Sequence, residues 1–265
     1  MVLRSDDSGS SALDEPDLVF ETTCPHCGRV GNSEATFCGG CGGRVHGRLS
    51  PVQETAREPG LWMALGLYAA ALAIIVGLMI ADGVGTDAMG LADWMFLALA
   101  GVALILNPRT TLPLFRAPRL TVSGIAKVLA AMGLTLGFVE LLVLLVPEVF
   151  FSPTALYRLE GISLGATLVS MAVMPAVAEE IIFRGPILGG LQRSFGNRSA
   201  IWVSAAMFAI LHLSVLSAVH LLAIGVLTAT VRLRTRSLLP PIAIHFGYNA
   251  VVVLLGWTRP ATDLW

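Results

Sequence analysis

Residues 199–231 read SAIWVSAAMFAILHLSVLSAVHLLAIGVLTATV, which is 33 residues without Asp, Glu, Lys or Arg. About 20 apolar residues cross a bilayer as an α-helix, so this stretch is too long for a single crossing. We expect two membrane-spanning helices here, joined by a tight turn near Leu213–Ser217. The stretch therefore predicts an all-α fold that crosses a membrane several times.

The composition of the whole chain supports this fold class. Of its 265 residues, 55% are hydrophobic and only 13% are charged, whereas about 25% of a typical soluble domain is charged. The net charge of -1 offers no basic surface, so we expect no nucleic-acid partner. The sequence predicts an integral membrane protein with the lipid bilayer as its partner, in the plasma membrane if the source is prokaryotic.

The apolar segments divide the chain into modules. Residues 1–20 are acidic and lack the apolar core of a signal peptide. The predicted organisation is a disordered lead at 1–20, a cysteine-rich module at 21–45, a linker at 46–60, a transmembrane domain at 61–257 and a tail at 258–265. Seven spans are predicted, and eight if one hides a break: 61–80, 91–106, 128–146, one beginning within 161–178, two within 199–231, and 238–257.

The distribution of basic residues predicts the orientation. Segments after the second, fourth and sixth spans are rich in Arg and Lys, whereas 81–90 has none and 147–160 has only Arg158. Basic loops stay in the cytoplasm, so we expect a cytoplasmic N-terminus and an external C-terminus. The basic residues are Arg109, Arg116, Arg119, Lys127, Arg193, Arg198, Arg232, Arg234 and Arg236.

All the cysteines lie in the N-terminal module, as two C-x2-C pairs separated by ten residues: Cys24, Cys27, Cys38 and Cys41. A glycine follows each pair, which lets backbone N–H groups point at the sulfurs. Four thiolates make a closed tetrahedral site, so the spacing predicts a zinc ribbon with structural zinc. Two disulfides would need an oxidising compartment. We interpret His26 and His46 as bystanders, and a cytosolic protein as a possible partner of the ribbon.

The sequence EEIIFR at 179–184 places three charged residues at membrane depth, where charge is costly and therefore a functional candidate. Residues four apart share a helix face, so Glu180 and Arg184 are expected to pair. Glu179 points about 100° away and has no basic partner in the motif. Glu180 and Arg184 are thus interpreted as structural support, and Glu179 as a candidate general base.

Two further motifs carry polar groups into apolar helices. FAILH ends at His212, and HFGYN spans His245 to Asn249, whose spacing of four puts both donors on one face, as an oxyanion hole requires. We interpret His220 and Glu140 as packing residues. Glu179 and His212 reach the same depth, roughly 20 Å, only if the fourth helix continues through Pro186 to about Gln192. We therefore predict a long fourth helix, kinked at Pro175 or Pro186.

The three motifs, in this order, resemble the CAAX protease and bacteriocin-processing (Abi) family, which includes type II CAAX prenyl endopeptidases and lysostaphin resistance protein A-like proteins. The family pattern is EExxxR, FxxxH and HxxxN, and the resemblance covers about residues 120–257. It implies an intramembrane peptidase that needs no catalytic metal and acts on a peptide or membrane-protein substrate. By position, Glu179 and His212 would activate water, and His245 and Asn249 would bind the oxyanion.

Two other interpretations stay open from the sequence. Glu179, His212 and His245 are also plausible zinc ligands, which would make the chain a metalloprotease. Alternatively, the chain would be a non-catalytic membrane adaptor or immunity-type protein, in which the polar cluster only fixes helix packing. The sequence leaves open whether the substrate is prenylated, and also the oligomeric state.

Overall fold

A computed structural model describes residues 21–24, 27, 29–32, 37–38, 40–43, 59–81, 85–118, 120–145 and 153–258. The chain divides into two compact units, Met1–Leu49 and Ser50–Trp265, and each is described by itself. The predicted lead, nearly all of the predicted linker and tail, and both His26 and His46 lie outside the described residues.

The N-terminal unit contains a short hairpin. Strand β1 (Glu21–Thr23) pairs antiparallel with β2 (Val30–Asn32), with Glu21 opposite Asn32 and Thr23 opposite Val30. The hairpin delivers Cys24 directly after β1. The Cys24 N–H donates to the Arg29 carbonyl at 2.9 Å, which closes the turn that carries the first cysteine pair.

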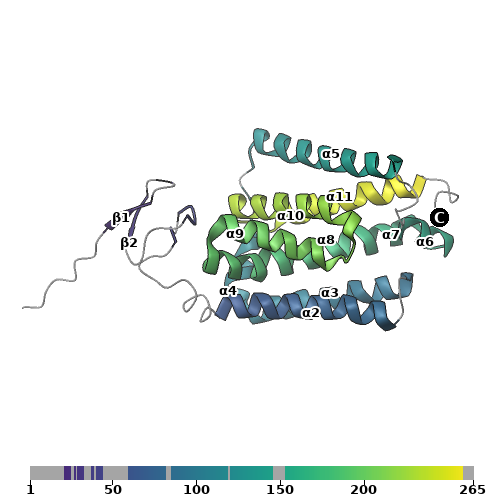
Figure 1. Ribbon diagram of the computed structural model, residues 1–265, viewed down its shortest axis with the longest axis horizontal. Coiled ribbons are helices and arrows are strands. Elements are labelled where there is room, and N and C mark those ends of the chain that lie inside the picture. Colours follow the sequence, from purple (N-terminus) through teal and green to yellow (C-terminus); the bar gives the residue numbers. More distant parts are fainter. Residues whose placement is uncertain are drawn as a thin grey trace, which may run out of the picture. The chain divides into compact units, whose positions relative to one another are not determined.

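The described residues of the second unit form helices and their connections, as the composition predicts (Figure 1). Six of its described segments are long and apolar enough to cross a membrane. Its elements are α2 (Pro59–Ala81), α3 (Thr86–Leu106), α4 (Pro108–Thr111), η1 (Leu112–Phe115), α5 (Val122–Leu145), α6 (Pro153–Leu159), α7 (Leu164–Leu168), η3 (Val169–Val173), α8 (Met174–Ile182), η4 (Phe183–Ile187), α9 (Leu188–Leu211), α10 (Val215–Thr235) and α11 (Leu239–Thr258).

The fourth apolar segment, Leu164–Leu211, is 48 residues long and contains a reversal. Gly196 lies inside α9 with φ 78° and ψ 171°, a conformation that glycine adopts without strain. The rings of Phe183 and Phe208 lie 5.3 Å apart, whereas 25 residues of straight helix would separate them by roughly 37 Å. The chain therefore folds back at Gly196, and the described segments make the seven helical passes that the sequence predicts.

The long fourth helix is also confirmed, because helical structure continues through Pro186 to the reversal. Two π-turns, η3 and η4, flank α8; Pro175 lies two residues after η3, and Pro186 lies inside η4. Pro186 has no N–H, and the preceding Gly185 has the non-helical ψ of -105°. The kink is therefore at Gly185–Pro186, directly after the motif that carries the glutamates.

Contacts between helix ends sort the loops into two groups. The Leu238 N–H donates to the Leu114 carbonyl at 2.7 Å, so the segments after α3 and α10 meet. The Arg158 guanidinium donates to the Trp257 carbonyl at 2.7 Å, so α6 meets the end of α11. Figure 1 draws α4 and α6 at opposite ends of the bundle. These contacts join only loops that the basic-residue pattern assigns to the same side.

Glycines allow the closest helix approaches. A Cβ on Gly190 would lie 2.2 Å from the Gly60 carbonyl oxygen, and one on Gly225 would lie 3.0 Å from the Ala205 Cα. Small residues at such crossings are the usual device of membrane helices, which gain little from the hydrophobic effect within lipid. The buried core accordingly lies around α8 and α9, whereas α5 contributes no buried residue.

We predict that Gly190→Ala destabilises the membrane unit by about 1–3 kcal/mol, because the new Cβ must displace the backbone of α2. The matched control is Gly66→Ala on α2, where a Cβ meets nothing within 4 Å. The control should be neutral or gain up to about 1 kcal/mol from helix propensity. Thermal unfolding of the purified chain in detergent measures both. Equal melting temperatures for the two variants would contradict the predicted contact.

Candidate active site and cysteine cluster

The four cysteines form a cage of the size that a zinc ion needs. Cys24 and Cys41 sulfurs lie 3.5 Å apart, Cys27 and Cys38 sulfurs lie 3.6 Å apart, and all four fall within 4.8 Å of one another. Zn–S bonds of about 2.3 Å at tetrahedral angles separate sulfurs by about 3.8 Å, whereas a disulfide needs about 2.05 Å. The cysteines are free thiols, and their arrangement fits zinc rather than two disulfides.

Backbone N–H groups point at the sulfurs of the second cysteine pair, from one glycine inside the pair and one after it. Gly40 N donates to the Cys38 sulfur at 3.4 Å, and Gly43 N donates to the Cys41 sulfur at 3.3 Å. The backbone N–H groups of Cys41 and Gly40 lower the pKa of the Cys38 thiol to about 6. For Cys41, the Gly43 N–H lowers the pKa, but hydrogen bonds to the other three sulfurs and burial together raise it to about 12. Because metals bind the thiolate, a zinc ion would have to displace the proton that Cys41 keeps.

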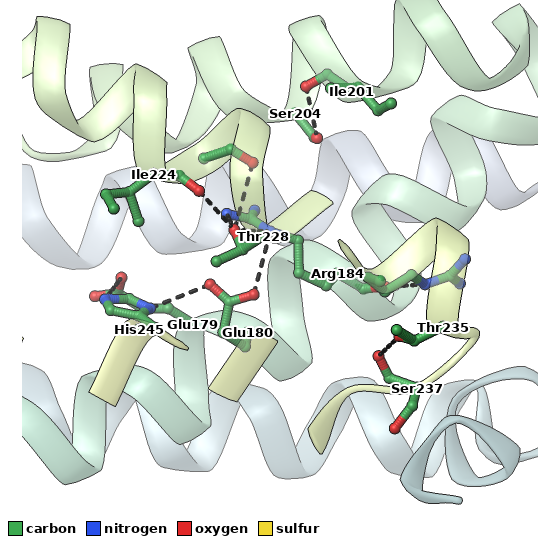
Figure 2. Close-up of polar contacts among 12 residues, drawn as sticks. Glu179, Glu180, Arg184, Ile201, Ser204, Ile224, Thr228, Thr235, Ser237 and His245 are labelled. Carbon is green, nitrogen blue, oxygen red and sulfur yellow. Dashed lines mark hydrogen bonds and ion pairs between the residues drawn. The ribbon is translucent and has the colours of Figure 1, made fainter. Parts of the chain in front are cut away.

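In the membrane unit, the predicted Glu180–Arg184 pair is present and fully buried. Arg184 Nε lies 3.2 Å from Glu180 Oε2, and both side chains have no exposed surface. The guanidinium also donates to Thr228 Oγ1, from Nε at 2.9 Å and from Nη2 at 2.6 Å. Its carbon lies 5.0 Å from the centroid of the Phe208 ring, within cation–π range. Figure 2 shows the glutamate, threonine and guanidinium together.

His245 lies between the two glutamates (Figure 2). Its Nδ1 donates to Glu180 Oε1 at 3.1 Å, and its Nε2 lies 4.0 Å from Glu179 Oε2. Within the described part of the chain, that Glu179 oxygen is buried and has no hydrogen-bond partner. Glu180 therefore touches a proposed catalytic residue as well as Arg184, which spacing along one helix could not reveal.

The Phe208 ring contacts both motif histidines. His212 Nδ1 lies 2.9 Å from the Phe208 carbonyl oxygen, which can only accept a hydrogen bond, so Nδ1 carries the proton. In the neutral ring, Nε2 then keeps a free lone pair. The Phe208 ring lies 4.9 Å from the His212 ring and 5.6 Å, edge-on, from the His245 ring. His212 is exposed at the end of α9, whereas His245 is buried.

Asn249 occupies the face of α11 that the motif spacing predicts, and one of its donors is already engaged. Its Nδ2 donates to the Met171 carbonyl in the π-turn η3 at 3.1 Å. A carboxamide carries two N–H bonds, so the second N–H is the one available to a ligand.

Three further residues of this region have contacts that the sequence did not predict. Thr228 is one of many small residues in an apolar run, and only the structure identifies it as the partner of Arg184. Asp93, which the sequence places at the edge of the second span, accepts a hydrogen bond from Ser170 in η3. His220 stacks on Tyr248 with ring centroids 6.1 Å apart, which agrees with its interpretation as a packing residue.

Comparison with known proteins adds one finding. No curated protein and no solved structure matches the chain. A family model described as type II CAAX prenyl endopeptidase Rce1-like matches residues 161–251, which contain α8, the reversal, α10 and all three motifs. Through this segment, which is about a third of the chain, the protein is similar to the Rce1-like type II CAAX prenyl endopeptidases.

Proposed function

We propose that the chain is an intramembrane endopeptidase that hydrolyses a peptide bond near the C-terminus of a membrane-associated protein or peptide. One observation carries the proposal. In the segment that matches the family, a buried Glu179 oxygen without a hydrogen-bond partner lies 4.0 Å from His245 Nε2. That separation is too long for a direct hydrogen bond but suits one bridging water.

In the proposed reaction, Glu179 takes a proton from this water, with His212 orienting it through Nε2. The resulting hydroxide attacks the scissile carbonyl carbon and forms a tetrahedral oxyanion. His245 Nε2–H and the second N–H of Asn249 donate to that oxyanion. When the C–N bond breaks, Glu179 returns its proton to the leaving amine, so protons and bonds balance over the cycle.

In this proposal, Glu180 and Arg184 position the catalytic residues without contacting the substrate. Because Glu180 accepts from His245 Nδ1, it fixes the orientation of the imidazole. His245 donates from Nε2 when both ring nitrogens carry a proton, a state whose charge the two neighbouring carboxylates balance. Arg184 and Thr228 in turn hold Glu180, so α8, α10 and α11 are tied at one point.

The proposal assigns metal only to the N-terminal unit, where the four cysteine ligand atoms converge. In this proposal the cysteines hold a structural zinc, and Glu179, His212 and His245 act directly. The ribbon and the N-terminus are placed in the cytoplasm, where thiols stay reduced.

The first prediction separates the two glutamates. Glu179→Gln should lower kcat by at least about 10²-fold, because it removes the general base, while the protein accumulates normally. Glu180→Gln should mainly lower the protein level, because breaking a buried charge pair costs about 3–5 kcal/mol. The assay uses the full chain in nanodiscs with a peptide that ends in a prenylated Cys and three further residues, beside an unprenylated copy.

Mass spectrometry of the released C-terminal tripeptide reports cleavage, and an immunoblot of the membrane fraction reports accumulation. Full activity in Glu179→Gln would contradict the mechanism. If the wild-type chain cleaves neither peptide, the proposed C-terminal substrate class is wrong. Preference between the two peptides decides whether the prenyl group is recognised.

The second prediction concerns metal. Purified wild-type chain should contain about one zinc ion, and a variant with all four cysteines changed to serine should contain none. Cleavage by both proteins should survive a strong chelator. Loss of cleavage in the four-serine variant on chelation, with recovery on adding zinc, would instead assign a metal to Glu179, His212 and His245.

A further inference from the structure

The π-turn η3 is held by a polar network that the proposed reaction does not use. Ser170, inside the turn, donates from its hydroxyl to Asp93 Oδ2 on α3. The same hydroxyl lies 2.8 Å from the Tyr157 OH on α6, and Tyr157 is only 4% exposed. Three elements distant in the sequence therefore meet on one serine.

The next residue in the turn reaches the candidate active site. The Met171 carbonyl accepts the hydrogen bond from Asn249 Nδ2 at 3.1 Å. A π-turn widens the helix and has weaker local geometry than an α-helical turn, so contacts from outside must hold it in place. Ser170 supplies those contacts directly beside the carbonyl that positions Asn249.

Asp93 places a carboxyl group within an apolar helix, where it accepts from Ser170. A carboxyl group within a membrane span is costly, and an ordinary packing contact between helices does not require one. The network therefore borders the proposed oxyanion donor, Asn249.

We infer that Asp93, Ser170 and Tyr157 are positioning residues, which hold η3 so that the Met171 carbonyl fixes the Asn249 carboxamide for catalysis. The catalytic consequence rests on the proposed peptidase activity. The claim about the turn itself does not, because it concerns only backbone geometry. The two parts can therefore be tested separately.

The first measurement is amide hydrogen exchange across residues 169–175 of the full chain in nanodiscs. Asp93→Ala and Ser170→Ala should each raise exchange roughly tenfold, which is the loss expected for one hydrogen bond. Ser170→Thr and Asp93→Asn keep the hydroxyl and an acceptor oxygen, so both should restore protection. The control is Thr86→Val, which removes a hydroxyl–carboxylate contact between α3 and Glu160 but touches no residue of η3.

Unchanged exchange in Ser170→Ala, or an equal rise in Thr86→Val, would overturn the inference. This measurement needs no substrate. If the wild-type chain cleaves no peptide, the proposed function fails while the exchange data still decide whether the network holds the turn.

The second measurement is a double-mutant cycle on cleavage. Ser170→Ala should lower kcat roughly tenfold with KM nearly unchanged, because Asn249 acts on a charge that exists only in the transition state. In an Asn249→Ala background, the same substitution should have no further effect. Additive losses would overturn the inference, since they would mean that Ser170 acts on packing in general. A tenfold loss of kcat in Asp93→Asn, with amide exchange in η3 unchanged, would also overturn the inference. It would show that the charge of Asp93 acts directly on Glu179.

Discussion

The buried guanidinium of Arg184 is the constraint on which the rest of the membrane unit depends. A fully buried charge in a lipid-embedded bundle is tolerable only when partners surround it. Glu180 supplies the counter-charge, Thr228 supplies an acceptor, and the Phe208 ring supplies a π-face. Because these partners come from α8, α10 and α9, satisfying one side chain fixes three helices against one another. His245 joins the same cluster through Glu180, which adds α11.

The π-turns on either side of α8 leave backbone carbonyls that accept hydrogen bonds from side chains on neighbouring helices. Carbonyls that lose their helical partners must be satisfied by protein groups at membrane depth. Around Pro186, Arg232 Nε donates to the Arg184 carbonyl at 2.9 Å, and in η3 the Asn249 carboxamide donates to the Met171 carbonyl. Each irregular turn is thereby matched to a side chain on a neighbouring helix, which fixes the rotation of that helix as well as its distance.

Features set by short-range geometry were predictable from the sequence. The C-x2-C spacing predicted the cysteine cage, and the i,i+4 spacing predicted the Glu180–Arg184 pair. Requiring Glu179 and His212 to share one depth predicted the helix through Pro186. Contacts between helices were not predictable. Helix rotation decides whether Glu180 faces His245 and which carbonyl Asn249 meets, and close packing at residues such as Gly190 sets that rotation, which no local pattern encodes.

The structure also changes the role that the sequence assigned to Glu180. Spacing alone assigns Glu180 to support and Glu179 to chemistry, but Glu180 contacts His245 directly, so supporting the helix and orienting the imidazole are one role. The same arrangement explains why Glu179 stays without a basic partner on its own helix. Nε of Arg184 faces Glu180, and Nε and Nη2 both donate to Thr228, so the hydrogen bonds of the guanidinium go to these two residues. Glu179 Oε2 instead lies 4.0 Å from His245 Nε2, and this carboxylate–imidazole pair is what the proposed activation of water requires.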